Sequence, residues 1–266
     1  YDEAWIEIYF WQESVELYPG QKRPAIVICP GGAYAMTSDR EAEAVALRFM
    51  SMGYHAVVLR YSVAPARYPA ALRQLAKTVA LLRENSEKWH IETDKIIVSG
   101  FSAGGHLAAS LGVFWNTTEL KEITGFDNEM IRPDGMILNY PVITSGEFGH
   151  QESFHNLLGE KYEEMKDKMS LEYQVTEDTP KTFIWHTFED ETVLLDNTLR
   201  FVQALYKKGI PVEYHVFPQG PHGLGLASEL TANENGRGIV RACEPWSELA
   251  GKWLNREFPW WGGATV

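Results

Sequence analysis

The stretch "VSGFSAGGHLA", residues 98–108, decides the fold class of this chain. An apolar, β-branched run at 96–98 leads into it, and a pattern typical of a helix follows it. Ser102 stands between Gly100 and Gly104, where no bulky side chain lies beside its hydroxyl. Two interpretations follow: a tight turn that only connects a strand to a helix, or a strained turn that presents a nucleophilic serine.

Short apolar runs alternate with longer amphipathic segments on both sides of this stretch. Strands are predicted at 25–29, 55–59, 95–99, 135–140, 182–186 and 212–217. Helices are predicted at 41–52, 68–84, 103–114, 192–208 and 245–255. The alternation predicts an α/β fold, with a mostly parallel, doubly wound sheet and helices on both faces. Sheets of this kind place ligand sites beyond the carboxyl ends of their strands.

The segment 144–180 breaks the alternation and is too long for an ordinary connection. It carries apolar side chains, among them Phe154 and Leu157, which favour a small helical cap over a disordered loop. We therefore expect one domain over 1–266 with a cap insertion at about 144–180. A shorter excursion is expected at 116–128.

Composition limits the classes of partner. With 266 residues, 45% of them hydrophobic and 23% charged, the chain can bury a full core without a disulfide or a metal. The net charge of −12 disfavours nucleic acid and anionic membranes as partners. Cys29 and Cys243 are far apart and are expected to be reduced. The cysteines and histidines lack zinc spacing, so no metal is expected.

The sequence also carries expectations about the location and the assembly of the protein. No apolar run approaches the ~18 residues of a membrane span. The start, Tyr1-Asp2-Glu3, does not resemble a signal peptide, and on that pattern we expect a cytoplasmic protein, although the chain does not begin with Met. The apolar cap or the C-terminal tail is a candidate contact for a homodimer.

Ser102 is the predicted nucleophile, because Gly-x-Ser-x-Gly after a strand and before a helix is the context that such a serine requires. The N–H of Ala103, at the start of that helix, would face a developing oxyanion. A serine hydroxyl needs a base, and in this arrangement the histidine comes last in the chain. His222, in "FPQGPHGLG", follows the last strand, whereas His186 and His215 look like core residues or residues behind the site.

The acid is expected after the preceding strand, in "FIWHTFEDETV", where Glu189, Asp190 and Glu191 are candidates. Asp190 is favoured, because Val193 three residues later returns to a helical pattern. A buried carboxylate there would hold the tautomer of His222. The alternative is a solvated acidic turn.

The loop after the first predicted parallel strand, "CPGGAY", supplies the remaining oxyanion donors. The N–H groups of Gly32 and Ala33 are the expected donors, with Gly31 forming the turn against the substrate. The alternative is a simple Pro-Gly turn. Tyr34 and Tyr140 end strands near the predicted site, and they either line the substrate pocket or pack the core.

Several motifs occur in order: "CPGGAY", "LRYSVAP", "YPAAL", "GFSAGGHLA", "WHTFEDETV" and "FPQGPHGLGLA". Together they resemble the α/β-hydrolase esterases, and more narrowly the acetyl esterase and acetyl-xylan-esterase-like branch related to the hormone-sensitive-lipase group. The resemblance covers about 23–254. It implies an α/β-hydrolase fold, a triad of Ser102, Asp190 and His222, and an oxyanion hole formed by 31–33 with Ala103.

The resemblance also implies short acyl groups, with acetyl esters of carbohydrate such as xylo-oligosaccharides as the leading substrates, and no cofactor. Two positions depart from the family pattern: Pro30 stands where histidine is common, and Ala33 where glycine is common. A methyl group at 33 is tolerable unless the backbone φ is positive.

The sequence therefore predicts a serine carboxylesterase that forms an acyl-enzyme. One alternative is a serine peptidase of the prolyl-oligopeptidase type, although the chain has no room for the large extra domain such enzymes usually carry. The other is a non-catalytic hydrolase-fold binding protein, which would be expected to lack a member of the triad.

Overall fold

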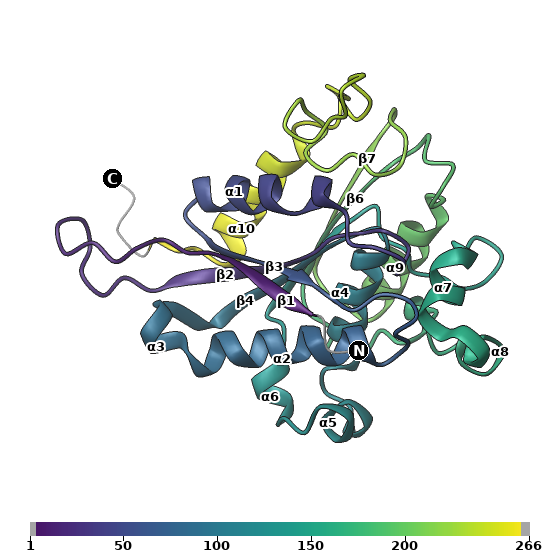
Figure 1. The fold of residues 1–266 in the computed structure, drawn as a ribbon, viewed down its shortest axis with the longest axis horizontal. Helices are drawn as coiled ribbons and strands as arrows, with labels where there is room; N and C mark the ends of the chain where they lie inside the picture. Colours follow the sequence, from purple (N-terminus) through teal and green to yellow (C-terminus); the bar gives the residue numbers. More distant parts are fainter. Residues whose placement is uncertain (1–3, 262–266) are drawn as a thin grey trace.

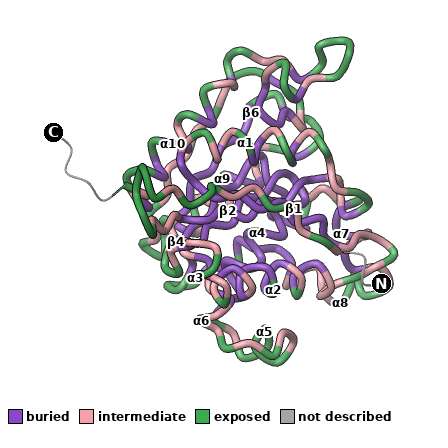
Figure 2. Tube along the Cα trace, turned by 60° about the vertical axis from the view of Figure 1, so that its left-hand side comes forward, coloured by how far each residue is buried: buried purple, intermediate pink, exposed green. Residues whose placement is uncertain are grey.

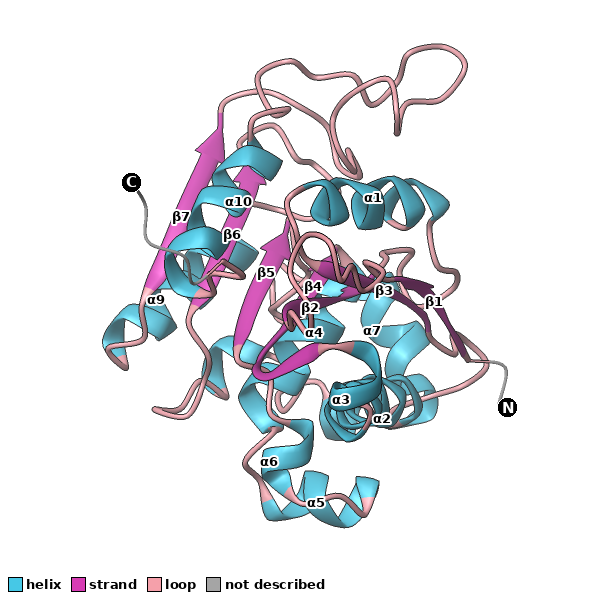
Figure 3. Ribbon diagram, turned by 90° about the vertical axis from the view of Figure 1, so that its left-hand side faces the viewer, coloured by secondary structure: helices cyan, strands magenta, loops and turns pink. Residues whose placement is uncertain are grey.

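Parallel strands of β-branched and apolar residues form the centre of the molecule (Figures 1 and 3). The computed structural model describes residues 4–261. Within them, seven strands form one sheet in the order β1-β3-β2-β4-β5-β6-β7, and β1 alone runs antiparallel to its neighbour. The strands are β1 (Trp5–Tyr9), β2 (Arg23–Cys29), β3 (His55–Arg60), β4 (Ile91–Phe101), β5 (Gly135–Asn139), β6 (Thr182–Thr187) and β7 (Val212–Phe217).

Helices cover both faces of the sheet because successive strand residues point to opposite sides and both sides are apolar. On one face, α1 (Glu43–Ser51) and α10 (Trp246–Glu257) pack against the sheet; on the other lie α2 (Ala70–Glu84), α4 (Ala103–Phe114) and α9 (Asp196–Lys207) (Figure 1). Every residue of α4 is buried, as its colour in Figure 2 shows. The shorter elements are η1 (Asp39–Glu41), α3 (Ser86–Trp89), α5 (Thr118–Thr124), α6 (Asn128–Ile131), α7 (Gln151–Leu158), η2 (Gly159–Lys161), α8 (Tyr162–Met165) and η3 (Leu171–Tyr173).

The register of the sheet brings the carboxyl ends of five strands to one edge. Cys29 pairs with Gly100, Phe101 with Asn139, Asn139 with Trp185, and Thr187 with Phe217; each pairing joins two neighbouring strands at or near their ends. The loops that follow these strands therefore meet at the same edge. Those loops carry the residues singled out in the sequence.

The predicted α/β class with a mostly parallel sheet is confirmed, and all six predicted strands are present. The sequence missed β1, the antiparallel edge strand. The helix predicted at 41–52 begins at Glu43, because η1 occupies 39–41, and the one predicted at 192–208 begins at Asp196. Cys29 and Cys243 are both free, as predicted, and both are buried.

The segment 144–180, predicted as a cap, contains α7, η2, α8 and η3. The excursion predicted at 116–128 contains α5 and the start of α6. Among residues 4–261, no helix is both long enough and apolar enough to cross a bilayer. The predictions about the first three residues lie outside the described part of the chain.

Candidate active site

Ser102 occupies the turn between β4 and α4 with a backbone φ of 52° and ψ of −120°. An L-residue in this region is strained, which is typical of functional turns. The two flanking glycines make the turn sterically feasible. A Cβ on Gly100 would lie 2.1 Å from the carbonyl oxygen of Gly104, and one on Gly104 would lie 2.1 Å from that of Cys29. The glycines at this motif are therefore required by close backbone approach on both sides of the serine.

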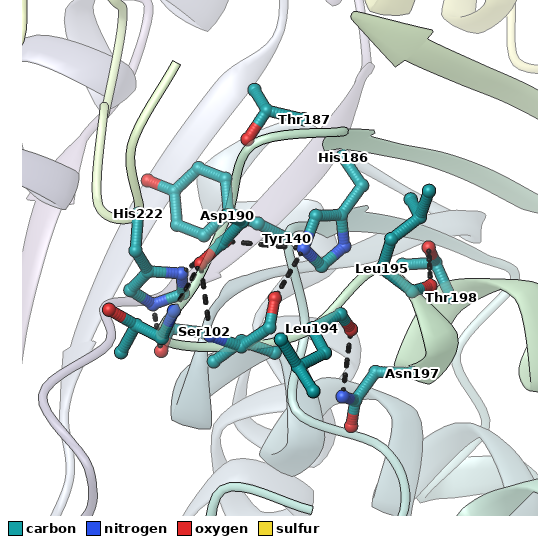
Figure 4. Close-up of polar contacts among 12 residues, drawn as sticks. Ser102, Tyr140, His186, Thr187, Asp190, Leu194, Leu195, Asn197, Thr198 and His222 are labelled. Carbon is teal, nitrogen blue, oxygen red and sulfur yellow. Dashed lines mark hydrogen bonds and ion pairs between the residues drawn. The ribbon is translucent and has the colours of Figure 1, made fainter. Parts of the chain in front are cut away.

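His222 reaches Ser102 from the loop after β7 (Figure 4). Its Nε2 lies 2.7 Å from Ser102 Oγ, and its Nδ1 lies 2.6 Å from Asp190 Oδ2. The edge of the Tyr140 ring packs against the imidazole, with ring centroids 5.0 Å apart. The loop is anchored at Gly220, whose N–H donates to Glu189 Oε2 over 3.2 Å. The structure therefore brings the three predicted triad residues into one hydrogen-bonded chain.

Asp190 is the carboxylate that contacts His222. Of the other two candidates, Glu189 accepts the N–H of Gly220 in the loop that carries His222, and Glu191 is exposed. Asp190 Oδ1 accepts the N–H groups of Thr192 and Val193 at 3.0 and 2.9 Å. Burial by itself raises the pKa of Asp190, but hydrogen bonds from His186 and His222 outweigh burial and hold this pKa well below its usual value. Asp190 is thus ionised at neutral pH and fixed in orientation.

His186 lies behind the triad, as its sequence position suggested, and is fully buried (Figure 4). Its Nε2 lies 2.8 Å from the carbonyl oxygen of Val193 and 3.2 Å from Asp190 Oδ2. Both partners are acceptors, so Nε2 carries the proton. Nδ1 is buried without a hydrogen-bond partner among the described residues. His186 therefore donates to the carboxylate that orients His222.

The loop 30–34, called the oxyanion loop below, has an unusual backbone. Gly32, Ala33 and Tyr34 have φ values of 128°, 54° and 55° in succession. The N–H of Gly31 donates to Glu41 Oε2 over 2.7 Å, and the carbonyl of Ala33 accepts from the side chain of Asn156 over 2.9 Å. A methyl group at position 33 is tolerable only where the backbone φ is not positive. Because φ is 54°, Ala33 is strained.

The N–H groups predicted as oxyanion donors are available. Gly32, Ala33 and Ala103 donate none of the backbone hydrogen bonds found among residues 4–261. Gly32 and Ala33 line the same pocket as Ser102. Ala103 begins a twelve-residue helix, whose N-terminus favours negative charge. Gly31 lines no part of that pocket, and its N–H is already used by Glu41.

A pocket of about 550 Å³ opens at Ser102 and His222. Apolar and polar residues both line it besides Ser102 and His222. The ionisable or hydroxyl-bearing residues on this wall, besides the triad, are Ser38, Arg40, Glu41, His150, Glu152 and Thr192. His150 and Glu152 lie at the start of α7, so the predicted cap segment supplies part of the wall. Burial, followed by the charge of His222, lowers the pKa of His150.

Tyr34 and Tyr140 lie in the interior beside the site, and neither lines the pocket. The Tyr34 hydroxyl lies 2.9 Å from Nδ1 of the buried His106. The Tyr140 hydroxyl donates to Glu41 Oε1 over 2.7 Å. Of the two readings left open by the sequence, the structure therefore places both rings as packing residues.

Glu41 and Asn156 contact the oxyanion loop, and no pattern in the sequence singles them out. Glu41 falls in the charged run "DREAE" at the predicted start of a helix, where a carboxylate is ordinary. Asn156 falls in the predicted cap, where an amide on a helix is equally ordinary. Their contacts depend on how distant loops fold against each other, so no spacing in the sequence marks them.

Comparison with known proteins places this architecture in a family. The pattern of the family described as BD-FAE matches residues 15–205 of this chain. The chain belongs to the BD-FAE family. The Endo-1,4-beta-xylanase B of Butyrivibrio fibrisolvens is 38% identical over 78% of the chain, and the Acetylxylan esterase of Xylanibacter ruminicola is 26% identical over 77%. This BD-FAE family member spans 33% of the first protein's length and 42% of the second's.

Solved structures extend the likeness to nearly the whole chain. The acetyl ester-xyloside bifunctional hydrolase from Caldicellulosiruptor lactoaceticus matches with a TM-score of 0.80 and 35% identity, covering 94% of this chain and 87% of that one. The carboxylesterase Cest-2923 from Lactobacillus plantarum matches with a TM-score of 0.86 and 29% identity, covering 97% and 94%. The BD-FAE family member thus has the α/β-hydrolase fold, and the predicted resemblance to acetyl-xylan-esterase-like hydrolases of ester bonds is confirmed.

Proposed function

We propose that this protein is a serine carboxylesterase that removes short acyl groups, acetyl above all, from carbohydrate such as acetylated xylo-oligosaccharides. The observation that carries the proposal is the continuous hydrogen-bonded chain from Ser102 Oγ through His222 to Asp190. Each residue type occupies the position that its part in acyl transfer requires. The polar side chains on the pocket wall and the names of the relatives support the choice of substrate.

The mechanism follows from that geometry. His222 Nε2 accepts the proton of Ser102 as Oγ attacks the ester carbonyl, and the imidazolium then protonates the leaving alcohol. Asp190 holds the proton of His222 on Nδ1 and stabilises the cation that forms at each step. Water activated by the same Nε2 releases the acid from the acyl-enzyme and regenerates the hydroxyl.

The oxyanion of each tetrahedral intermediate is assigned to the N–H groups of Gly32, Ala33 and Ala103. These donors are backbone groups, two on the strained loop and one at the N-terminus of α4, so they need little reorganisation during the reaction. A donor of this kind is worth about 10²–10³ in turnover.

The leaving group is assigned to the open, polar side of the pocket. Arg40, Glu152 and Thr192 offer donors and acceptors there, which suit the hydroxyls of a sugar better than a long alkyl chain. A sugar ester has a polyhydroxyl alcohol and a small acyl group, and the polar side chains on the wall suit that alcohol.

The nucleophile is tested by Ser102→Ala with Ser110→Ala as the matched control. Ser110 lies on the same helix, and its hydroxyl donates to the carbonyl of His106 rather than to the triad. On p-nitrophenyl acetate we expect Ser102→Ala to lose at least about 10⁴-fold in kcat and Ser110→Ala to stay within about threefold. Retained activity in Ser102→Ala would refute the assignment.

The substrate class is tested by a panel of p-nitrophenyl esters from acetate to decanoate, together with acetylated xylo-oligosaccharides. We expect the highest kcat/KM on acetate and release of acetic acid from the oligosaccharides. Preference for long acyl chains would overturn the carbohydrate assignment. Cleavage of aminoacyl-proline amides but not of esters would favour the peptidase, and no turnover of any substrate would favour the binding protein.

A further inference from the structure

We infer that Glu41 is a positioning residue that couples the oxyanion loop to the loop carrying His222. This inference rests on the proposed function and adds a residue to it. The loop 218–225, called the histidine loop below, and the oxyanion loop follow different strands. The oxyanion loop bonds the carboxylate of Glu41 directly, and the histidine loop bonds it through Tyr140. The side chain of Glu41 touches no reacting atom in this arrangement and acts through its hydrogen bonds.

The two carboxylate oxygens of Glu41 accept hydrogen bonds from different partners, one in the oxyanion loop and one, Tyr140, that contacts the histidine loop. Oε2 accepts the N–H of Gly31 over 2.7 Å, at the start of the oxyanion loop. Oε1 accepts the hydroxyl proton of Tyr140 over 2.7 Å. The Tyr140 oxygen in turn accepts the N–H of Gly225 over 2.9 Å, and its ring packs edge-on against the imidazole of His222. Glu41 therefore fixes the donors on one side of Ser102 and the base on the other.

The first of these contacts sets the backbone of the oxyanion loop. The Gly31 N–H is bonded to Glu41, whereas the N–H groups of Gly32 and Ala33, which line the pocket, donate no backbone hydrogen bond among residues 4–261. The approach is close: a Cβ on Gly31 would lie 2.8 Å from Glu41 Oε2 and 2.9 Å from the Cβ of Ser102. The carboxylate thus lies directly behind the loop, close to the nucleophile.

Burying the carboxylate of Glu41 costs free energy, which its hydrogen bonds must offset. Glu41 is 3% exposed, and among the described residues it forms no ion pair. The neighbouring Arg40 instead donates to the carbonyl oxygens of Gly223 and Thr231. A buried carboxylate without an ion pair is costly unless it accepts strong hydrogen bonds, and these are the bonds that hold the two loops.

Glu41→Gln and Tyr140→Phe, alone and combined, test the inference. Glutamine keeps the shape but replaces one of the two acceptor oxygens with an NH₂ donor, so one of the two hydrogen bonds is lost. Phenylalanine keeps the ring on His222 but leaves Gly225 N–H and Glu41 Oε1 without partners. Glu172→Gln is the matched control, because Glu172 is also a buried carboxylate but neither of its oxygens has a hydrogen-bond partner among residues 4–261.

On p-nitrophenyl acetate we expect each single variant to lose about 10-fold to 100-fold in kcat, with KM within about threefold of the wild type. The double variant should lose little more than the worse single variant, because both act on one network. Glu172→Gln should keep kcat within about threefold. Wild-type-like kcat in both single variants, or fully multiplicative losses, would overturn the inference.

The rate of covalent labelling by a fluorophosphonate gives a second measurement that needs no natural substrate. It should fall by a similar factor in both single variants, because the reagent uses the same nucleophile, base and oxyanion donors. If Glu41→Gln does not fold, Tyr140→Phe alone decides, and a wild-type labelling rate in it overturns the inference. A wild type that is labelled but hydrolyses no ester would contradict the proposed function instead, so the two failures are distinguishable.

Discussion

At the scale of single residues, the carboxylate of Asp190 shows how the site is held. It accepts two backbone N–H groups on Oδ1 and faces two imidazoles on Oδ2 (Figure 4). The backbone bonds fix the direction of the carboxylate, and His186 occupies the side that His222 leaves open. The orientation of His222 is therefore set through Asp190, which the two backbone N–H groups and His186 hold in place.

Asp190→Asn tests that orientation. The amide can present its N–H₂ to His222 and so select the wrong tautomer, which leaves Nε2 protonated and unable to act as a base. We expect kcat to fall about 10³–10⁴-fold with an unchanged circular dichroism spectrum. Glu191→Gln, at an exposed neighbouring carboxylate, is the control and should keep full activity. A loss smaller than tenfold would show that Asp190 does not set the tautomer.

Ala33→Gly tests the strain in the oxyanion loop. With φ at 54°, the methyl group of Ala33 costs about 1–2 kcal/mol, and glycine removes that cost while adding about 0.5–1 kcal/mol of backbone entropy in the unfolded state. We expect the free energy of unfolding to rise by up to about 1 kcal/mol in urea titrations. Ala35→Gly, at an exposed neighbour with negative φ, should lower it instead. Equal destabilisation by both changes would contradict the strain.

The sequence predicted the triad but not its supports, and the reason is physical. Ser102 and His222 lie in loops whose position after a strand can be read from local patterns, so their meeting follows from the fold. The same argument predicts an acid among Glu189, Asp190 and Glu191. Only the contact with His222 in the structure distinguishes Asp190 from the other two. Glu41 has no such local pattern, because its partners, Gly31 and Tyr140, come from loops at two other strands.

At the scale of elements, α7 is linked directly to the oxyanion loop. Asn156, on this helix, donates to the carbonyl oxygen of Ala33 over 2.9 Å. The same helix places Phe154 edge-on against His106, with ring centroids 5.2 Å apart, and His106 in turn faces the Tyr34 hydroxyl. The segment 144–180 thus supports the oxyanion loop as well as contributing to the pocket wall.

Asn156→Ala tests this link. Loss of one hydrogen bond to the loop should loosen the peptide groups of Ala33, and we expect kcat to fall about threefold to tenfold with little change in KM. His155→Ala, an exposed neighbour on α7, is the control and should retain wild-type kcat. Indistinguishable kinetics for the two variants would mean that α7 does not support the loop.

The parallel strands could be predicted from the sequence, whereas the edge strand β1 and the start of α1 could not. The parallel strands are continuous apolar runs because both faces are buried, and this pattern is easy to recognise. In β1, "WIEIY", the side chains are only partly buried or exposed, and the strand pairs on one side only, so its pattern is weak. The predicted helix 41–52 starts before α1 does, because the turn of η1 precedes α1 and the apolar periodicity does not distinguish the two.

At the scale of the whole molecule, the buried histidines link stability to pH. Burial lowers the pKa values of His55 and His106 to about 4 each. In the unfolded chain a histidine has a pKa near 6.5. The unfolded state therefore binds protons that the native state does not, and this part of the stability is present above pH 6.5 and is lost as the pH falls toward 4. Burial raises the pKa of Glu41 and Asp134, which opposes this trend.

His55→Asn isolates one histidine from this balance. His55 lies far from the triad along the chain and bonds the N–H of Trp11 and the carbonyl of His90. We expect the variant to take up about one proton fewer on unfolding near pH 5 than the wild type does. The measurement is the slope of the free energy of unfolding against pH, from urea titrations between pH 7 and 5. Identical slopes would contradict the burial of a neutral imidazole at this position.

The central claim is that Ser102, activated by His222, forms an acyl-enzyme. It is tested most directly by quenching the protein in acid during turnover of p-nitrophenyl acetate and mapping the covalent acetyl group by peptide mass spectrometry. In the wild type we expect one acetyl group, on the peptide containing Ser102, and in the Ser102→Ala variant we expect none. Acetylation at another residue, or a burst of nitrophenol in Ser102→Ala, would contradict the claim.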